Sequence, residues 1–313
     1  MKQITSLLFC AILFSLTSIT QTVSAQSVRI NLSEQGITDE QLVELINNET
    51  IPLTVKRLNL AINNISDLTP LTIFKELEWL ELGKNQISDF SPLVELSNLR
   101  ELNLWENQIT DLTSLSELKN LQNLKILNLS KNQIIDISPL SELKNLQLLS
   151  LRQNFITDIS PLANLTNLGG SFGSLSLDDN QITDISPLTN LTNLQYLSLD
   201  RNPITDLTPL ENLTNLTFVT LWGTHTTQEQ RDDLYEKLSK ARIFLGCVLG
   251  GKEPTIEDAL EILKYLAGLD SVIKPDTDAW WASLITGGDE PSIEDALEIL
   301  KYLAGLESRV GVR

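Results

Sequence analysis

Apolar positions in the middle of the chain recur with a period close to 22 residues. Residues 77–98 read LEWLELGKNQISDFSPLVELSN, and residues 99–120 repeat the same order of leucines, asparagine and aspartate. A fixed period of this length is typical of a solenoid, in which each repeat forms one coil stacked on the next. We therefore expect stacked coils with a shared core over residues 55–224.

One asparagine in each repeat marks the register. Its positions are separated by 22, 22, 25, 22, 26 and 22 residues: Asn63, Asn85, Asn107, Asn132, Asn154, Asn180 and Asn202. An asparagine amide can pair with backbone groups of adjacent coils that would otherwise be buried without a partner. We expect these side chains to join neighbouring coils.

Each repeat also predicts its own elements. The two leucines of the LxL segment would point inward and the residue between them outward, which predicts a short strand, and stacked strands of this kind form a parallel sheet. The Asp-Ile/Leu-Ser/Thr-Pro-Leu segment then starts the return leg, where Ser or Thr would cap a short helical turn and Pro would occupy its first position. The expected fold class is an α/β solenoid with a parallel β-sheet on its concave face and short helical or 3-10 turns on its convex face.

Helical segments flank the repeats, as the ends of a solenoid require. Residues 26–54 form an N-terminal cap and an atypical first repeat, with a helix predicted over 37–48. Residues 225–242 are predicted to be a C-terminal cap helix, because Thr227 and Gln230 have the spacing of a capping box. The apolar positions of this helix share one face: Leu234, Leu238 and Ala241.

The signature NxIxDLxPLxxLxNL resembles the internalin-like subclass of the leucine-rich repeat family, whose repeats have 22 residues. The resemblance extends from residue 28 to about residue 224. It implies a solenoid, and the register then shows which side chains leave the concave face.

Three of the five tryptophans are predicted on this face, together with charged side chains. The candidate ligand-binding residues are Trp79, Glu81, Glu101, Trp105, Arg152, Asp178, Tyr196, Asp200, Phe218 and Trp222. Aromatic residues on such a wall indicate binding of a protein or a glycan. For Tyr196, Phe218 and Trp222 the alternative is that the cap helix or the tail covers them.

Charge excludes one class of partner. The chain has 41 acidic and 23 basic residues and a net charge of -18, and such a surface repels phosphate backbones. Nucleic acid is therefore not an expected partner.

Catalysis is not expected either. Glu81 and Glu101 lie on adjacent predicted strands, about 4.8 Å apart, so they could meet the spacing of glycosidase carboxylates by accident. Asp178 and Asp200 are also neighbours and, flanked by Arg152, are interpreted as a polar contact patch. The single histidine, His225, has no nucleophile beside it in the repeat.

The N-terminus predicts export. Residues 1–25 have the basic start, apolar stretch and small-residue end of a signal peptide, so the mature, secreted chain would begin near Gln26. The apolar stretch, residues 7–16, is too short to span a bilayer, and no other long apolar run predicts a membrane span. Cys10 would leave with the signal, so Cys247 has no partner within the chain, and a disulfide between two chains stays open.

The tail carries one helical pattern twice. PTIEDALEILKYLAGLDS occupies residues 254–271, and PSIEDALEILKYLAGLES occupies residues 291–308. Their apolar positions fall on one helical face, so the two helices can pack together. With the residues that precede each helix, residues 243–313 resemble the dockerin module, which has two loop-helix calcium motifs and binds cohesin domains.

The dockerin resemblance implies a docking surface and a possible cohesin-like scaffold partner. The matching docking positions are Ile256, Glu257, Lys264, Ile293, Glu294 and Lys301. Most of the calcium ligands are replaced, and the residual loop positions are Thr255, Asp258, Ser292 and Asp295. Calcium takes six to eight oxygens, so we expect metal-free loops and no cofactor.

These patterns together predict a secreted, non-catalytic binding protein, with a recognition face on the solenoid and a docking tail. One alternative is an accessory component of a cellulosome-like polysaccharide-degrading complex with a functional dockerin. Another is a structural adhesin whose tail is only a C-terminal cap.

Overall fold

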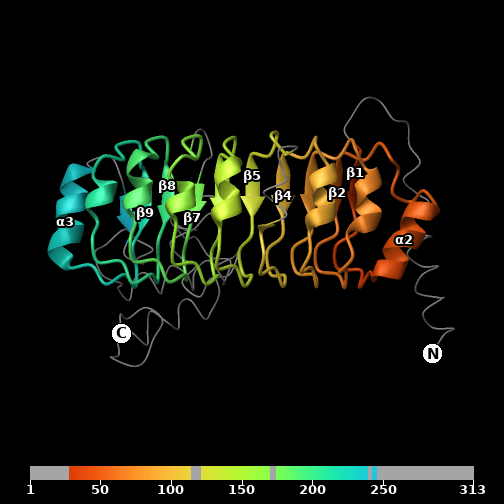
Figure 1. Ribbon diagram of the computed structural model, residues 1–313, viewed down its shortest axis with the longest axis horizontal. Helices are drawn as coiled ribbons and strands as arrows, with labels where there is room; N and C mark the ends of the chain where they lie inside the picture. The colour runs from red at the N-terminus through yellow and green to blue at the C-terminus, as the bar shows by residue number, and fades with distance from the viewer. Residues whose placement is uncertain (1–27, 114–120, 170–173, 239–241, 245–313) are drawn as a thin grey trace, which may run out of the picture.

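The computed structural model describes residues 28–113, 121–169, 174–238 and 242–244. They form a solenoid with one sheet of ten parallel strands whose order in space follows the chain from β1 to β10 (Figure 1). Each strand has three residues: β1 Arg29–Asn31, β2 Arg57–Asn59, β3 Trp79–Glu81, β4 Glu101–Asn103, β5 Ile126–Asn128, β6 Leu148–Ser150, β7 Ser174–Ser176, β8 Tyr196–Ser198, β9 Phe218–Thr220 and β10 Arg242–Phe244. The predicted parallel sheet is confirmed.

Residues at the same position of successive repeats lie side by side in the sheet. Trp79, for example, pairs with Arg57 on one side and with Glu101 on the other. The alternate side chains point into a continuous core, where Leu80 and Leu82 are 1% and 0% exposed. Burying a leucine side chain contributes about 1.5–3 kcal/mol, so the repeated leucines provide most of the driving force for stacking.

The return legs contain 3-10 helices, and the prediction for how they begin was wrong. The residue before each of these helices is apolar and its side chain makes no capping bond; the helices are η2 Thr69–Ile73, η3 Ser91–Glu95, η5 Ser138–Glu142, η6 Ser160–Leu162, η7 Ser186–Asn190 and η8 Thr208–Leu210. Proline is the second residue of each of these helices, one position later than predicted.

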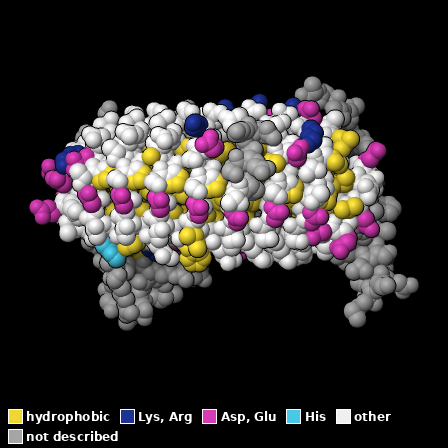
Figure 2. Space-filling view, viewed as in Figure 1, with side chains coloured by type: hydrophobic (Ala, Val, Ile, Leu, Met, Phe, Trp, Pro, Cys, Tyr) yellow, Lys and Arg dark blue, Asp and Glu magenta, His cyan; other side chains and the backbone are white. Residues whose placement is uncertain are grey.

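The repeat aspartate takes the capping role instead of Ser or Thr. Asp89 Oδ1 accepts a hydrogen bond from the Ser91 amide at 2.8 Å, and Asp136 accepts one from the Ser138 amide at 2.8 Å. A short acidic side chain readily accepts from the backbone two residues on. Figure 2 shows acidic side chains in a row along one face of the solenoid.

Both ends of the repeat array carry the predicted helices. Helix α2 (Asp39–Asn47) begins with a capping box between Thr38 and Gln41. Helix α3 (Gln228–Lys237) begins with the predicted capping box between Thr227 and Gln230.

The C-terminal cap differs from the prediction in its extent. Leu234 and Leu238 are buried at 1% and 2% exposure, while Ala241 lies outside the described residues. The helix ends at Lys237, before the expected residue 242, and the chain then adds strand β10, which pairs with β9. The sheet edge therefore continues past the cap helix.

The register asparagines join neighbouring coils as predicted. The Asn107 amide donates to the carbonyl oxygens of Leu82 and Leu104, at 3.1 Å each, and its Oδ1 accepts from the Ile87 amide at 3.0 Å. The same bonds recur at the other register asparagines, all of which are buried. These side chains satisfy backbone groups that the three-residue strands leave without partners.

The residue before each register asparagine has a left-handed backbone, which the sequence did not indicate because none of these residues is glycine. The φ angles run from 51° to 57° for Ile62, Lys84, Glu106, Lys131, Gln153, Asp179 and Arg201. This conformation costs roughly 1–2 kcal/mol for a residue with a Cβ. The coil geometry maintains it in every repeat, and it directs a mostly charged column along one border of the sheet.

Two predicted regions lie outside the described residues. They are the signal peptide, residues 1–25, and the dockerin-like segment from residue 245 to residue 313, with its docking and residual loop positions. In the part of the chain that the structure describes, no helix is long and apolar enough to cross a membrane.

Neighbouring asparagines provide a test of the inter-coil bonds. Asn63 is buried, and its amide donates to Leu32 O at 3.0 Å and Leu60 O at 2.8 Å, while Oδ1 accepts from the Ile37 amide at 2.9 Å. Asn63→Ala should lower the free energy of unfolding by about 2–4 kcal/mol, because it leaves several buried backbone groups unsatisfied. Chemical denaturation measures this change.

The matched control is the next residue. Asn64 is exposed, and its side-chain amide makes two long bonds, donating to Gly36 O at 3.4 Å and accepting from Gln86 Nε2 at 3.4 Å, so Asn64→Ala should cost less than about 0.5 kcal/mol. Equal losses in the two variants would contradict the role given to the register asparagines.

Candidate functional site

The outward side chains of strands β1–β9 and of the residues that directly follow them form one surface, which we term the sheet face. It is the surface predicted to be concave, and it contains all ten predicted ligand-binding residues. The structure places them in neighbouring columns, as the register required. Their exposure and their partners differ strongly along the array.

Trp79 lies at the N-terminal end of the sheet face and is half-buried. The guanidinium carbons of Arg29 and Arg57 lie over its ring, at 5.8 and 5.0 Å from the ring centroid. A guanidinium at this distance is attracted by the negative face of an indole. Two strands therefore supply cations to one tryptophan.

Trp105 is half-buried and lies against Gly83 of the preceding coil. A Cβ added to Gly83 would be 1.8 Å from the indole Nε1, so only glycine permits this close approach. The coil on the other side supplies Lys131, whose Nζ lies 5.4 Å from the ring centroid. The indole is thus packed against its neighbours, not freely presented to solvent.

The two predicted glutamates differ in their surroundings. Glu81 accepts hydrogen bonds from the Gly83 amide at 3.0 Å and from the Asn103 side chain at 2.9 Å. Glu101 is half-buried beside Trp79 in the register. Because both oxygens of Glu81 bond to the protein itself, this pair does not have the arrangement of a glycosidase acid and nucleophile.

Asp178 is buried within the sheet face, at 6% exposure. Its carboxylate accepts from the Ser176 hydroxyl at 2.7 Å, from the Ser198 hydroxyl and from the Asp200 amide at 3.0 Å. Asp178 therefore bonds mainly to the sheet and offers little surface to a ligand.

Asp200 is half-buried on the next strand, and its Oδ1 accepts from the Trp222 amide at 2.8 Å. Burial and the charge of Asp178 raise the pKa of Asp200 to about 7, although Arg201 and hydrogen bonds from Trp222 and Thr220 act to lower it.

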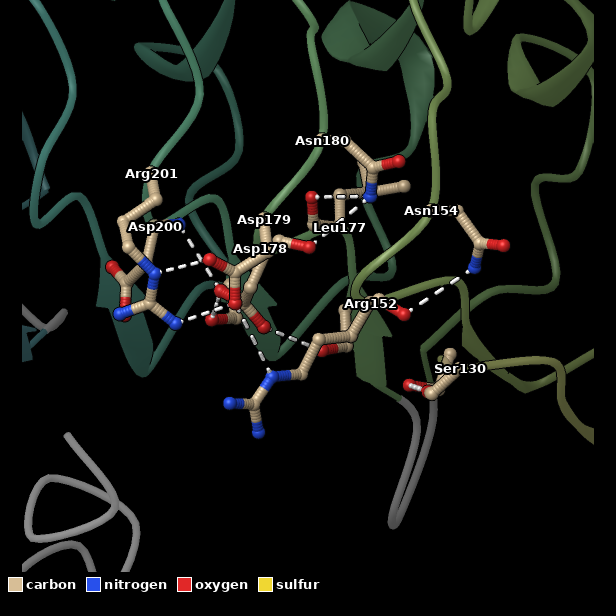
Figure 3. Close-up of polar contacts among 12 residues, drawn as sticks. Ser130, Arg152, Asn154, Leu177, Asp178, Asp179, Asn180, Asp200 and Arg201 are labelled. Carbon is tan, nitrogen blue, oxygen red and sulfur yellow. Dashed lines mark hydrogen bonds and ion pairs between the residues drawn. The ribbon is translucent and has the colours of Figure 1, made fainter. Parts of the chain in front are cut away.

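Arg152 contacts Asp179 and not the predicted Asp178–Asp200 pair. Its Nε lies 3.7 Å from Asp179 Oδ2, and Arg201 forms a closer ion pair with the same carboxylate, as Figure 3 shows. Burial raises the pKa of Asp179, but the bond and charge of Arg201 and the charge of Arg152 outweigh it, so the pKa is lowered overall. Asp179 belongs to the left-handed column, which the sequence reading had not included in the site.

The aromatic residues at the C-terminal end of the sheet face are mostly covered. Tyr196 is 37% exposed, whereas Phe218 and Trp222 are each 6% exposed. Arg201 lies over the Trp222 ring, 4.8 Å from its centroid. Burial of Phe218 and Trp222 favours the alternative in which these two side chains are covered.

The sequence reading missed the cations that accompany the tryptophans. Arg57 was visible in the same column as Trp79, and Arg29 aligns with it once β1 is recognised as a strand. Lys131 and Arg201 occupy left-handed positions, whose direction the repeat pattern does not reveal. Within the described residues, no group of three histidine, cysteine or acidic side chains is placed to hold a metal ion.

The raised pKa of Asp200 predicts a dependence of stability on pH. The folded protein holds this proton up to about pH 7, whereas an unfolded aspartate releases it near pH 3.9. Between these values the folded state binds more protons, so its stability should fall as the pH rises. Thermal unfolding between pH 5 and pH 8 measures this change.

Asp200→Asn should remove this dependence of stability on pH, because the asparagine side chain keeps an acceptor for the Trp222 amide but cannot ionise. At pH 8 this variant should be more stable than the natural chain by on the order of 2 kcal/mol. Asp206→Asn is the control, since the pKa of Asp206 is lowered by its bonds to Thr208 and its titration lies below this range. Equal pH slopes in the natural chain and Asp200→Asn would refute the assignment.

Comparison with known proteins agrees with the repeat architecture. The family profile described as "Leucine Rich repeats (2 copies)" matches residues 75–120, 97–142, 122–164 and 174–212. No curated protein sequence is similar enough to count as a match.

Solved structures similar to this chain include two bacterial leucine-rich repeat proteins. Internalin C2 from Listeria monocytogenes is 40% identical over 66% of this chain and 82% of its own, with a TM-score of 0.52. A leucine-rich repeat protein of Leptospira interrogans is 31% identical over 61% of this chain and 49% of its own, with a TM-score of 0.56. The chain therefore belongs to the leucine-rich repeat family and is related to the internalins.

Proposed function

We propose that the protein is a secreted, non-catalytic binding protein that recognises a macromolecular ligand with its sheet face. The observation that carries this proposal is the composition of that face. Tyr196 is 37% exposed, Trp79 and Trp105 are half-buried, and charged side chains surround them. Partly exposed aromatic residues beside cations are typical of protein recognition surfaces.

The tryptophan environments favour a protein ligand over a neutral glycan. Each sheet-face tryptophan has a cation over its ring, and Trp105 also packs against Gly83. A sugar that stacks on tryptophan needs an open ring face, which these contacts reduce. A protein ligand can instead bond to the charged groups around the rings.

The tail adds a second part to the proposal. The duplicated helices and their dockerin resemblance support docking to an extracellular or surface assembly through Ile256, Glu257 and Lys264 of the first copy and Ile293, Glu294 and Lys301 of the second. The replaced loop ligands support docking without calcium. Export rests on the signal-like pattern of residues 1–25.

The tail proposal is tested with the full chain and a chain ending at Phe244. The longer chain should retain a cohesin-like scaffold protein from the producing cell both in calcium and in chelator, and the shorter one should not. Retention that requires calcium would favour the accessory component of a polysaccharide-degrading complex. Equal behaviour of the two chains would leave the tail as a cap.

Two exposed tyrosines test the sheet face. Tyr196 lies on this face, whereas Tyr235 lies on helix α3 and is 58% exposed. Tyr196→Ala should reduce capture of extracellular protein ligands by the immobilised full chain at least fivefold, because it removes an aromatic contact worth about 1 kcal/mol or more.

Tyr235→Ala is the matched control and should capture ligands as the natural chain does. Both variants remove an exposed ring, so both should unfold at nearly the natural temperature. Capture that depends on Tyr235 but not on Tyr196 would rule out the sheet face as the binding surface.

A further inference from the structure

We propose that Arg29, Arg57 and Trp79 form a site for carboxylate side chains in an acidic segment of a protein partner. This inference rests on the proposed function and gives the partner a chemical class. The site lies at the N-terminal end of the sheet face. It consists of one residue from each of three consecutive strands.

The strand register brings the three side chains together. Arg29 pairs with Arg57 across β1 and β2, and Arg57 pairs with Trp79 across β2 and β3. Both guanidiniums lie within 6 Å of the Trp79 centroid, at 5.8 and 5.0 Å. An arginine that stacks through its planar face keeps its N–H edge available for bidentate bonding to a carboxylate.

The two arginines differ from other cations of the same face in having no carboxylate at ion-pair distance among the described residues, although the charge of Arg57 contributes to lowering the pKa of Glu78. Lys131 pairs with Glu106 at 3.5 Å, and Arg201 pairs with Asp179. Across the described ranges, no carboxylate lies within 4.0 Å of Arg29 or Arg57.

Arg57 also has an unused donor. Its Nε is buried and has no hydrogen-bond partner among the described residues. A buried donor without a partner is uncommon in folded proteins and costs about 1–3 kcal/mol. Because this Nε is shielded from solvent, a ligand carboxylate would bond through the terminal N–H groups of Arg57 and supply the counter-charge at this end of the sheet face.

The surroundings favour a protein carboxylate over a polyanion. Glu101 lies beside Trp79 in the register, and Glu81 follows two residues after Trp79 on the same strand. A long run of phosphates or sulfates would meet these acids and a chain of net charge -18. One or two carboxylates match the size of the basic spot, and the indole adds apolar area for the rest of the segment.

Defined peptides test this site on the full chain. The probe is a fluorescent hexapeptide of alternating Glu and Gly residues, and its uncharged counterpart has Gln in place of Glu. The acidic peptide should bind at least tenfold more tightly than the Gln peptide at low salt. Arg57→Gln should weaken binding of the acidic peptide about tenfold and Arg29→Gln at least threefold.

Arg100→Gln is the control, because the Arg100 side chain is 60% exposed and pairs with Glu78 at 3.8 Å. The affinity of the Arg100→Gln variant for the acidic peptide should equal that of the natural chain. Arg29 lies on the exposed first strand, so Arg29→Gln keeps the test valid if Arg57→Gln fails to fold. Equal affinity for both peptides, or equal losses in Arg29→Gln and Arg100→Gln, would overturn the proposal. Peptide binding does not involve Tyr196, so this failure is distinct from failure of the proposed function.

Discussion

The bond network of the register asparagines is the constraint on which the rest of the structure depends. Strands of three residues leave many backbone groups at each coil corner without a ladder partner, and one buried amide in each coil bonds to them. To place that amide inside, the preceding residue adopts a left-handed backbone in every repeat. The side chain at that position then borders the sheet face. The same geometry therefore holds the coils together and lays down a charged column beside the candidate binding surface.

The side chains of that left-handed column set the distribution of charge around the tryptophans of the sheet face. Lys131 and Arg201 come from it and lie over Trp105 and Trp222, while Glu106 and Asp179 come from it and pair with cations of neighbouring coils. The result is a face with two different ends. Among the described residues, the N-terminal end has two arginines around Trp79 with no carboxylate at ion-pair distance, and the C-terminal end has the carboxylates of the buried Asp178 and the half-buried Asp200. A partner that complements both ends would bind in one orientation.

Periodicity was sufficient to predict the strands, the inward leucines, the asparagine bonds and the capping box of Thr227 and Gln230. Each of these follows from local residue types at fixed spacing. The exposure of the sheet-face side chains could not be predicted in this way, because it depends on which residues of neighbouring coils contact them. Whether Trp105 is exposed depends on Gly83 one coil earlier and Lys131 one coil later. The capping role passes from serine to aspartate because the 3-10 helix begins at the serine itself, one residue earlier than a serine cap would require. Strand β10 formed where the helical pattern had been extended too far, and it pairs with β9 of the preceding coil.

Hydroxyl-radical footprinting of the full chain, with and without a captured extracellular protein, tests the central claim that the sheet face recognises a partner. Oxidation reports the solvent access of each aromatic side chain. The account predicts that Tyr196 and Trp79 lose reactivity in the complex, while Tyr235 on helix α3 and Phe155, which is 49% exposed outside the sheet face, keep theirs. Protection of Tyr235 or Phe155 with unchanged reactivity of Tyr196 and Trp79 would contradict it and would place the binding surface elsewhere on the solenoid.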